Sequence, residues 1–151
     1  MSTPVFGHVG SYRPGDTFSN RIELAFSGLH RPRRTGVCGT RQLGAESIVL
    51  AGQYEEDEFC ETEIRYSGSG GRDPRSGRQS TDQIAAGTNL ALLKSQETGW
   101  PVRVLRKVPA EHGGPAVYRY EGLYHVVGAN YGPGKSGFQV FVFRLRPLQH
   151  K

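Results

Sequence analysis

Apolar and polar residues follow a strand-like pattern through most of this 151-residue chain. The run at 47–51 is apolar after its first residue and predicts a buried strand. Residues 59–66 alternate between the two kinds of side chain, so that one face of a half-buried antiparallel strand would carry Cys60, Thr62, Ile64 and Tyr66. Both runs favour a sheet as the main element of the fold.

Three later runs are rich in Val, Tyr and Phe and are separated by Gly and Pro, at residues 102–108, 117–127 and 138–145. One segment has helical spacing instead. Ser80 and Gln83 match a capping box, and a stripe at helical spacing follows, made of Ile84, Thr88, Ala91, Leu92 and Ser95. The pattern predicts the α+β class, either a mostly antiparallel sheet with one helix or a helix-decorated barrel.

Composition agrees with one globular domain over residues 1–151, because the chain is 36% hydrophobic and 10% aromatic. No apolar run reaches the roughly 20 residues of a membrane span, and the N-terminus lacks the pattern of a secretory signal. The net charge of +5 favours a polyanionic partner.

Cysteine and histidine are too sparse and scattered to indicate a metal site. The two cysteines, Cys38 and Cys60, support neither a disulfide framework nor a zinc cluster. The five histidines show no ligand spacing. We therefore expect no metal and no cofactor, and reduced thiols in an intracellular compartment.

Between two tyrosines, Tyr54 and Tyr66, stands the acidic run at 55–58, and the Gly-rich stretch Ser-Gly-Ser-Gly-Gly-Arg follows at 67–72. The acidic run is either a solvated turn or the source of an inward carboxylate. The Gly-rich stretch is either a flexible hairpin or a loop whose N–H groups hold a phosphate, with Arg72 adding charge. Stacking faces, a carboxylate and an anion-binding loop together suit a nucleotide. The basic cluster at 30–34 is either a solvated surface or a rigid phosphate-facing loop.

A resemblance extends over roughly residues 6–145. The chain resembles the SRA domain family (SET- and RING-associated, also called YDG) in motifs that run in family order, namely GLHRP at 28–32, GVCG at 36–39, VLAGQY at 49–54, YSGSGGRD at 66–73, DQ at 82–83, PVRV at 101–104, RYEGLY at 119–124 and GKSGF at 134–138. The resemblance implies a twisted, partly closed antiparallel β-barrel with flanking helices. It also implies a reader that flips modified cytosine out of double-stranded DNA.

The family motif assigns roles to residues of this chain. Tyr54 and Tyr66 would sandwich the flipped 5-methylcytosine or 5-hydroxymethylcytosine, and Asp57 would accept from its exocyclic amine. The remaining base-pocket residues implied are Ala51, Gly52, Gln53, Ser67, Gly68 and Ser69. Phosphates would be held by Ser69, Gly70, Gly71, Arg72 and Lys135. Two loops facing the DNA would carry Arg33, Arg34, Thr35, Gly36, Arg75 and Arg78.

The chain departs from the family pattern at three places. The signature Tyr-Asp-Gly is Tyr-Glu-Gly at 120–122, and Gln53 replaces a common glycine at the pocket wall. The loop at 73–82 is about four residues shorter than in the eukaryotic reader of hemimethylated DNA. Recognition of hemimethylated sites is therefore not carried over.

Catalytic residues are not expected in this chain, which shows no HNH, PD-ExK or triad pattern. The resemblance favours the recognition module of a bacterial modification-dependent restriction endonuclease, cytoplasmic and nucleoid-associated, whose HNH-type nuclease domain lies outside this sequence. It leaves the oligomeric state open, since a missing domain could form a dimer. The alternatives are a nuclear chromatin-type reader, a small hydrolase or nucleotide-modifying enzyme using His30, Asp57 and Glu58, and a protein-interaction module.

Overall fold

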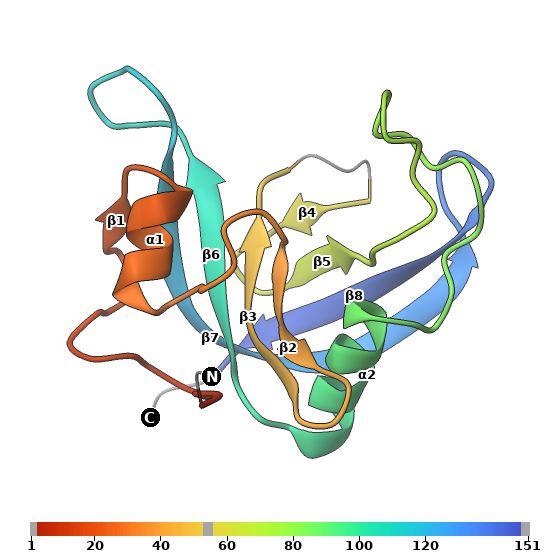
Figure 1. Ribbon diagram of the computed structural model, residues 1–151, viewed down its shortest axis with the longest axis horizontal. Helices are drawn as coiled ribbons and strands as arrows, with labels where there is room; N and C mark the ends of the chain where they lie inside the picture. The colour runs from red at the N-terminus through yellow and green to blue at the C-terminus, as the bar shows by residue number, and fades with distance from the viewer. Residues whose placement is uncertain (1–2, 53–55, 149–151) are drawn as a thin grey trace.

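The computed structural model describes residues 3–52 and 56–148, which form a curled sheet flanked by helices (Figure 1). Its strands are β1 (Thr17–Phe18), β2 (Val37–Thr40), β3 (Gly44–Leu50), β4 (Glu58–Phe59), β5 (Ile64–Ser67), β6 (Val102–Val108), β7 (Val117–Pro133) and β8 (Gln139–Pro147). Its helices are α1 (Arg21–Ser27) and α2 (Thr88–Thr98). The predicted α+β class is confirmed.

The described strands belong to one eight-stranded sheet in the order β2-β3-β6-β7-β8-β5-β4, with β1 paired to β7. Its pairs are antiparallel except for β3 and β6, which run parallel. A parallel pair needs a crossover connection, and here the crossover contains β4, β5 and α2. Among the described residues no ladder joins the edge strands β2 and β4, so the sheet is curled but open, which is consistent with the predicted partly closed barrel.

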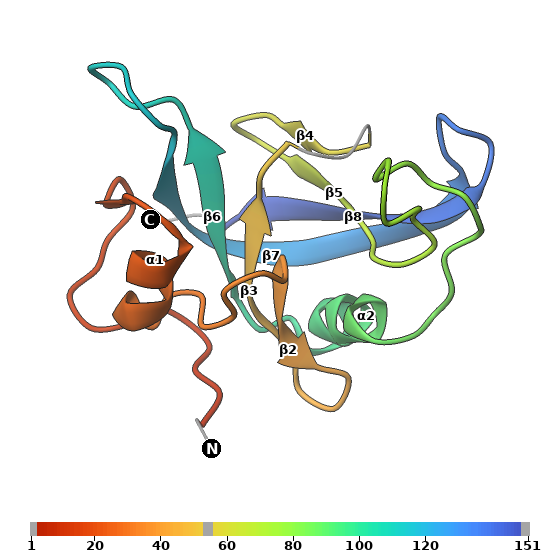
Figure 2. The same ribbon diagram turned by 45° about the horizontal axis from the view of Figure 1, so that its top comes forward.

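The long strand β7 produces the curl. It pairs with β6 from Val117 to Tyr124 and with β8 from Tyr124 to Pro133. A register shift interrupts each ladder, and such bulges bend a strand and increase its twist. Helix α2 packs against β2, β3 and β7 (Figure 2).

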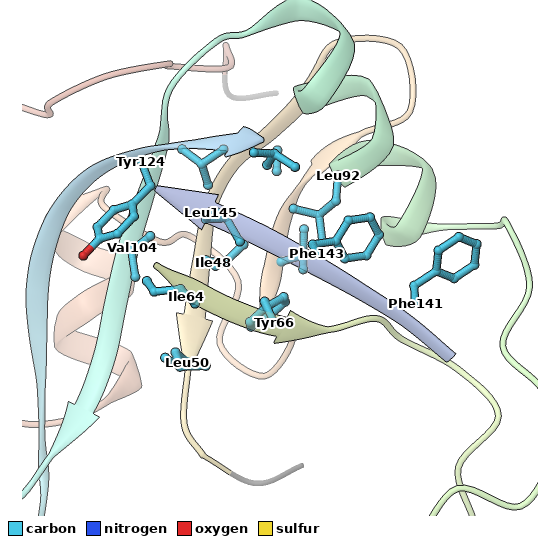
Figure 3. Packing of buried hydrophobic residues seen from close by; sticks show 14 residues of the cluster. Ile48, Leu50, Ile64, Tyr66, Leu92, Val104, Tyr124, Phe141, Phe143 and Leu145 are labelled. Carbon is cyan, nitrogen blue, oxygen red and sulfur yellow. The ribbon is translucent and has the colours of Figure 1, made fainter. Parts of the chain in front are cut away.

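Both faces of the central strands are buried. Every residue of β3 is buried, which confirms the strand predicted from the apolar run at 47–51. Ile48 and Val104 lie in the main core cluster, together with Leu92 of α2 (Figure 3). Val49 and Leu105 lie in a second cluster, which α1 and β1 cover. Such two-sided burial is the rule for parallel strands.

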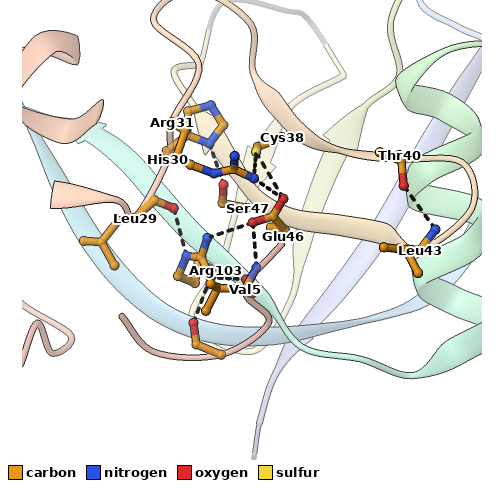
Figure 4. A network of polar contacts seen from close by, with 11 residues as sticks. Val5, Leu29, His30, Arg31, Cys38, Thr40, Leu43, Glu46, Ser47 and Arg103 are labelled. Atoms are coloured by element: carbon orange, nitrogen blue, oxygen red, sulfur yellow. Dashed lines mark hydrogen bonds and ion pairs between the residues drawn. The ribbon is translucent and has the colours of Figure 1, made fainter. Parts of the chain in front are cut away.

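A buried ion pair links the edge of the sheet to the N-terminal segment (Figure 4). Glu46 of β3 is 3% exposed, and its carboxylate accepts from Arg31 and from the Val5 N–H. Arg103 of β6 is fully buried, with Nη2 3.8 Å from Glu46 Oε1. The same guanidinium donates to the carbonyls of Val5, Gly7 and Leu29. Four segments of the chain thus meet at two charged side chains.

Two predictions about local structure were wrong. The chain turns between Cys60 and Glu63, so the strand predicted at 59–66 is a short hairpin of β4 and β5, and Thr62 is exposed. The helix predicted from Ser80 begins only at Thr88, with Gly87 as its N-cap. Gln83 caps no helix because its buried amide is bonded to Gly68 and Phe141. Tertiary contacts overrode the local pattern in both segments.

Helix α1 was not predicted, although it has clear ends. Asn20 caps it by accepting from the Glu23 N–H, and Gly28 ends it in the left-handed conformation. The Asn-x-x-Glu spacing was the available signal. The hydrophobic pattern concealed it, since Ile22 and Phe26 are 53% and 84% exposed and only Leu24 of this helix is buried.

A buried histidine gives the fold a pH dependence. His30 is fully buried, its Nε2 donates to the Thr35 carbonyl and its Nδ1 accepts from the Ser47 hydroxyl. Burial lowers the pKa of His30 to about 4 from 6.5. Below pH 6.5 the unfolded chain therefore binds a proton that the folded chain does not, and stability falls as the pH falls toward 4.

We expect His30 to reduce the free energy of unfolding by about 2 kcal/mol between pH 6.5 and pH 5. His30→Gln keeps a donor for Thr35 and an acceptor for Ser47 but does not titrate. Urea unfolding of both proteins at pH 7, 6 and 5 measures the effect. The stability gap between wild type and variant should shrink by that amount, and parallel pH curves would contradict the assignment.

Candidate functional site

A cavity of about 460 Å³ is formed where segments distant in the sequence converge. Its wall is formed by Arg21, Arg34, Thr35, Gly36, Val37, Val49, Ala51, Asp57, Tyr66, Ser67, Gly68, Ser69, Gly70, Gly71, Arg72, Thr88, Asn89, Leu92 and Tyr118. The volume lies in the range of about 300–1,000 Å³ that small-molecule sites occupy. Most of the residues assigned to the base pocket and the phosphate loop therefore surround one cavity.

Tyr66 forms a fixed part of this wall. It is 7% exposed and lies in the main core cluster with Ile64 and Phe143 (Figure 3). Its hydroxyl donates to the Gly36 carbonyl at 3.1 Å. A Cβ on Gly36 would lie 2.5 Å from that hydroxyl, so the close approach requires glycine. The other assigned stacking residue, Tyr54, and the wall residue Gln53 lie outside the described residues.

The described residues of the acidic run line different cavities. Asp57 lines the main cavity, and its Oδ1 accepts from the Ser67 N–H at 2.8 Å. Glu56 lines a separate cavity of about 410 Å³, and Glu58 lines one of about 180 Å³ together with Gly52. Asp57 is therefore the carboxylate of residues 56–58 that borders the site.

Three buried amide side chains hold the Gly-rich loop at 67–72. Asn89 of α2 accepts from the Ser69 N–H at 2.8 Å and donates to the Ser69 carbonyl at 2.9 Å. Gln83 and Gln79 donate to the carbonyls of Gly68 and Gly70, each at 2.9 Å. The three amides are 9% exposed or less. These amides brace the loop, and an antiparallel bridge between Arg72 and Gln79 closes a hairpin turn at its end.

The braced loop presents backbone donors to the cavity. Gly70 and Gly71 adopt φ angles of 94° and 71°, which favour glycine. Within the described part of the chain, their N–H groups donate to no other group, and both residues border the cavity. Arg72 lies beside them and donates to the Ser67 hydroxyl at 2.8 Å. Two N–H groups without an acceptor in the described chain, next to a guanidinium, are suited to an anion.

Lys135 does not join this group. It lies near the turn between β7 and β8 and lines the cavity of about 410 Å³ with Glu56, Arg65 and Arg144. The sequence placed it with the phosphate loop only through its family motif.

The loop at 32–36 is braced by two basic side chains from within the fold. Arg21 of α1 donates to the carbonyls of Pro32 and Thr35, and burial lowers the pKa of its guanidinium. His30 donates to the same Thr35 carbonyl. Arg34, Thr35 and Gly36 consequently line the cavity, whereas the exposed Arg33 does not.

The second assigned loop lies beyond β5 in the ribbon, away from the loop between α1 and β2 (Figures 1 and 2). Asp73 stabilises its turn by accepting from the N–H groups of Arg75 and Ser76. The side chains of Arg75 and Arg78 are exposed and do not line the cavity.

Several residues of the site were missed from the sequence. Asn89 and Leu92 lie on α2, and Arg21 and Tyr118 approach from α1 and β7. Asn89 carried a signal, since a buried polar residue inside an apolar helix stripe must bond to another segment. Arg21 carried none, because its role depends on carbonyls in a distant loop.

His30, one of the three residues of the enzyme alternative, is not accessible in the structure. His30 is sealed behind the loop at 32–36, and both of its ring nitrogens are bonded. The part of the chain that the structure describes has no group of three or more metal-ligating side chains. Among those residues, no helix has the length and apolar content to cross a membrane.

Comparison with known proteins identifies relatives over nearly the whole chain. The profile of the SAD/SRA domain matches residues 5–151. The E3 ubiquitin-protein ligase UHRF1 of Bos taurus is 40% identical over 93% of this chain, and the histone-lysine N-methyltransferase family member SUVH9 of Arabidopsis thaliana is 36% identical over 96%. The chain spans only 21% and 23% of these two proteins.

Solved structures show the same fold. A modification-dependent TagI restriction endonuclease superposes with a TM-score of 0.90 and 35% identity, over 99% of this chain and 54% of that one. The SRA domain of SUVH5 superposes with a TM-score of 0.81 and 32% identity, over 97% of this chain and 96% of that one. It was solved with methylated CHH DNA, fully methylated CG DNA and fully hydroxymethylated CG DNA.

We expect Asn89→Ala to lower the free energy of unfolding by about 1–3 kcal/mol, because the amide and carbonyl of Ser69 lose their partner. Hydrogen exchange at the Ser69 amide should accelerate at the same time. Thr88→Ala is the matched control, since it removes only the more exposed hydroxyl bond to Ser69. Equal changes in both variants would contradict a bracing role for Asn89.

Proposed function

The chain belongs to the SAD/SRA domain family, and on that basis we propose that it is a DNA reader. It flips 5-methylcytosine or 5-hydroxymethylcytosine out of duplex DNA and holds the base in the main cavity. The observation that carries this proposal is the convergence of Tyr66, Asp57 and the loop at 67–72 on that cavity. The SUVH5 complexes with methylated and hydroxymethylated DNA support the same ligand.

The proposed steps follow from the chemistry of the wall. Extruding a base from the stack costs a few kcal/mol. Stacking on aromatic rings returns about 1–3 kcal/mol for each base, and Tyr66 offers a ring whose position is fixed by its hydroxyl bond. The Asp57 carboxylate suits the N4 donor of cytosine, whereas thymine has a carbonyl there and is repelled. The wall thus favours cytosine over thymine.

The nucleotide's phosphate is assigned to the braced loop. The N–H groups of Gly70 and Gly71 and the guanidinium of Arg72 adjoin the cavity that would receive the base. Asn89 and Gln79 hold the loop in one conformation before DNA binds. Binding therefore costs little further conformational entropy in the loop. Arg33, Arg34, Arg75 and Arg78 would engage the duplex around the flipped base.

The parent protein is proposed to be a modification-dependent restriction endonuclease. The TagI structure supports this, since it contains the fold of this chain within a longer endonuclease. A cytoplasmic, nucleoid-associated protein would follow. A chromatin-type reader is the second candidate, which the 40% identity to UHRF1 supports. Cleavage of a methylated plasmid, but not its unmethylated form, by the protein containing this chain and its neighbouring sequence would decide for the endonuclease.

The central test is binding to matched duplexes that carry cytosine, 5-methylcytosine or 5-hydroxymethylcytosine at one site, on one strand or both. Wild type should prefer a modified duplex, and 2-aminopurine beside the site should report flipping. Asp57→Asn keeps an acceptor for the Ser67 N–H but presents a donor toward the cytosine amine. We expect it to lower affinity for the modified duplex about 10- to 100-fold.

Glu58→Gln is the matched control for Asp57→Asn, because it removes the same charge one residue away from the cavity. It should leave the preference unchanged. Equal losses of affinity for the modified duplex in the two variants would mean that the acidic run acts only as a general surface charge. Tyr66→Ala is not a usable test, since this core residue would cost about 3–5 kcal/mol of stability.

The exposed arginines should contribute to DNA affinity and not to base identity. Replacing Arg33, Arg34, Arg75 or Arg78 by Gln should weaken modified and unmodified duplexes by similar factors. Each lost phosphate contact should flatten the dependence of log K on log salt by about one unit. Affinities for both duplexes across a salt series measure this. If a variant lost only its preference for the modified duplex and kept the same salt slope, the replaced arginine would take part in base recognition.

A further inference from the structure

Arg106 of β6 lies beside the end of β3 and stacks on Phe59, two residues after Asp57. The chain leaves β3 at Leu50 and re-enters the sheet at β4, whose last residue is Phe59. Arg106 of β6 is the register partner of Leu50 in the parallel ladder. Its guanidinium carbon lies 3.9 Å from the centroid of the Phe59 ring.

Phe59 is fixed on its other side by the protein core. It is half-buried and packs against the main core cluster. Arg106 therefore stacks on a ring that is already anchored, at a distance well within the roughly 6 Å of a cation–π contact. Asp57 is only two residues from that ring.

A small cavity lies beside this segment. Its volume is about 180 Å³, and it is lined by Ala51, Gly52 and Asp57 together with Arg106 and Lys107. The described contacts of residues 57–59 include the bond from the Ser67 N–H to Asp57, the pairing of β4 with β5 and the stack of Arg106 on Phe59.

We propose that the stack of Arg106 on Phe59 positions Asp57 in the main cavity, which makes both side chains positioning residues for base recognition. This inference rests on the proposed function. A hydrogen bond to a base edge weakens steeply when distance or angle changes. Loosening the β4 end of the loop therefore reduces the preference for the modified base while leaving phosphate contacts intact.

Charge alone would give Arg106 a different role, as a phosphate contact. Lys107 allows the two roles to be separated, since it carries the same charge, lines the same small cavity and is exposed. A phosphate contact would change the salt slope and weaken all duplexes equally. A positioning contact changes the ratio of affinities for modified and unmodified duplexes at constant salt slope.

The experiment measures this affinity ratio and the salt slope in wild type, Arg106→Lys, Phe59→Leu and the double variant, with thermal melts as a check of folding. Arg106→Lys keeps the charge but loses the flat stacking group, and Phe59→Leu keeps apolar volume but loses the ring. Each single variant should lower the preference about three- to tenfold. The double variant should lose no more than the single ones, because both remove one interaction.

Phe59→Tyr retains the ring and should keep the wild-type preference, as should Lys107→Met. A preference that persists in Arg106→Lys and Phe59→Leu overturns the inference and leaves the proposed function standing. Equal weakening of both duplexes with a flatter salt slope in Arg106→Gln also overturns it, because Arg106 would then be a phosphate contact. A wild-type protein without preference overturns the proposed function and this inference together.

Discussion

The burial of one carboxylate constrains much of this fold. Glu46 sits in the middle of the all-buried strand β3, where an isolated charge would be strongly unfavourable. Arg103 and Arg31 compensate for it, and the guanidinium of Arg103 in turn needs carbonyl acceptors from residues 5–7 and Leu29. The N-terminal segment and the chain after α1 are therefore drawn against the same point. Removing one partner of such a buried pair typically costs about 3–5 kcal/mol.

The candidate site also depends on buried polar side chains that hydrogen-bond to the backbone of other segments. The amides of Gln79, Gln83 and Asn89 take up the carbonyls and N–H groups of a Gly-rich loop, and Arg21 does so for the loop at 32–36. Loops of this kind would otherwise lose much conformational freedom when a ligand binds. Here the loops become ordered when the chain folds, so the cavity is formed before any ligand binds.

The sequence predicted the parts of the fold that depend on local patterns. The strands near 102–108, 117–127 and 138–145 match β6, β7 and β8, because alternation and β-branched residues suit a half-buried sheet. The helix start at Ser80 failed, since Gln83 serves a tertiary contact that no local rule contains. The placement of Tyr66 at the cavity followed from its register in the family motif. Arg21 could not be assigned, because the carbonyls to which it donates lie in a loop that is separated from it in the chain.

The bond between the Tyr66 hydroxyl and the Gly36 carbonyl has a mechanical consequence. It joins the wall of the cavity to the loop at 32–36, at a place where a Cβ on Gly36 would lie 2.5 Å from the hydroxyl. If the chain reads DNA as proposed, a base that displaced the ring would also disturb this loop. Coupling between two sites is reciprocal, so insertion of the loop into DNA would then alter occupancy of the cavity by the same factor. Affinity for the base would in that case be a property of the loop as much as of the wall.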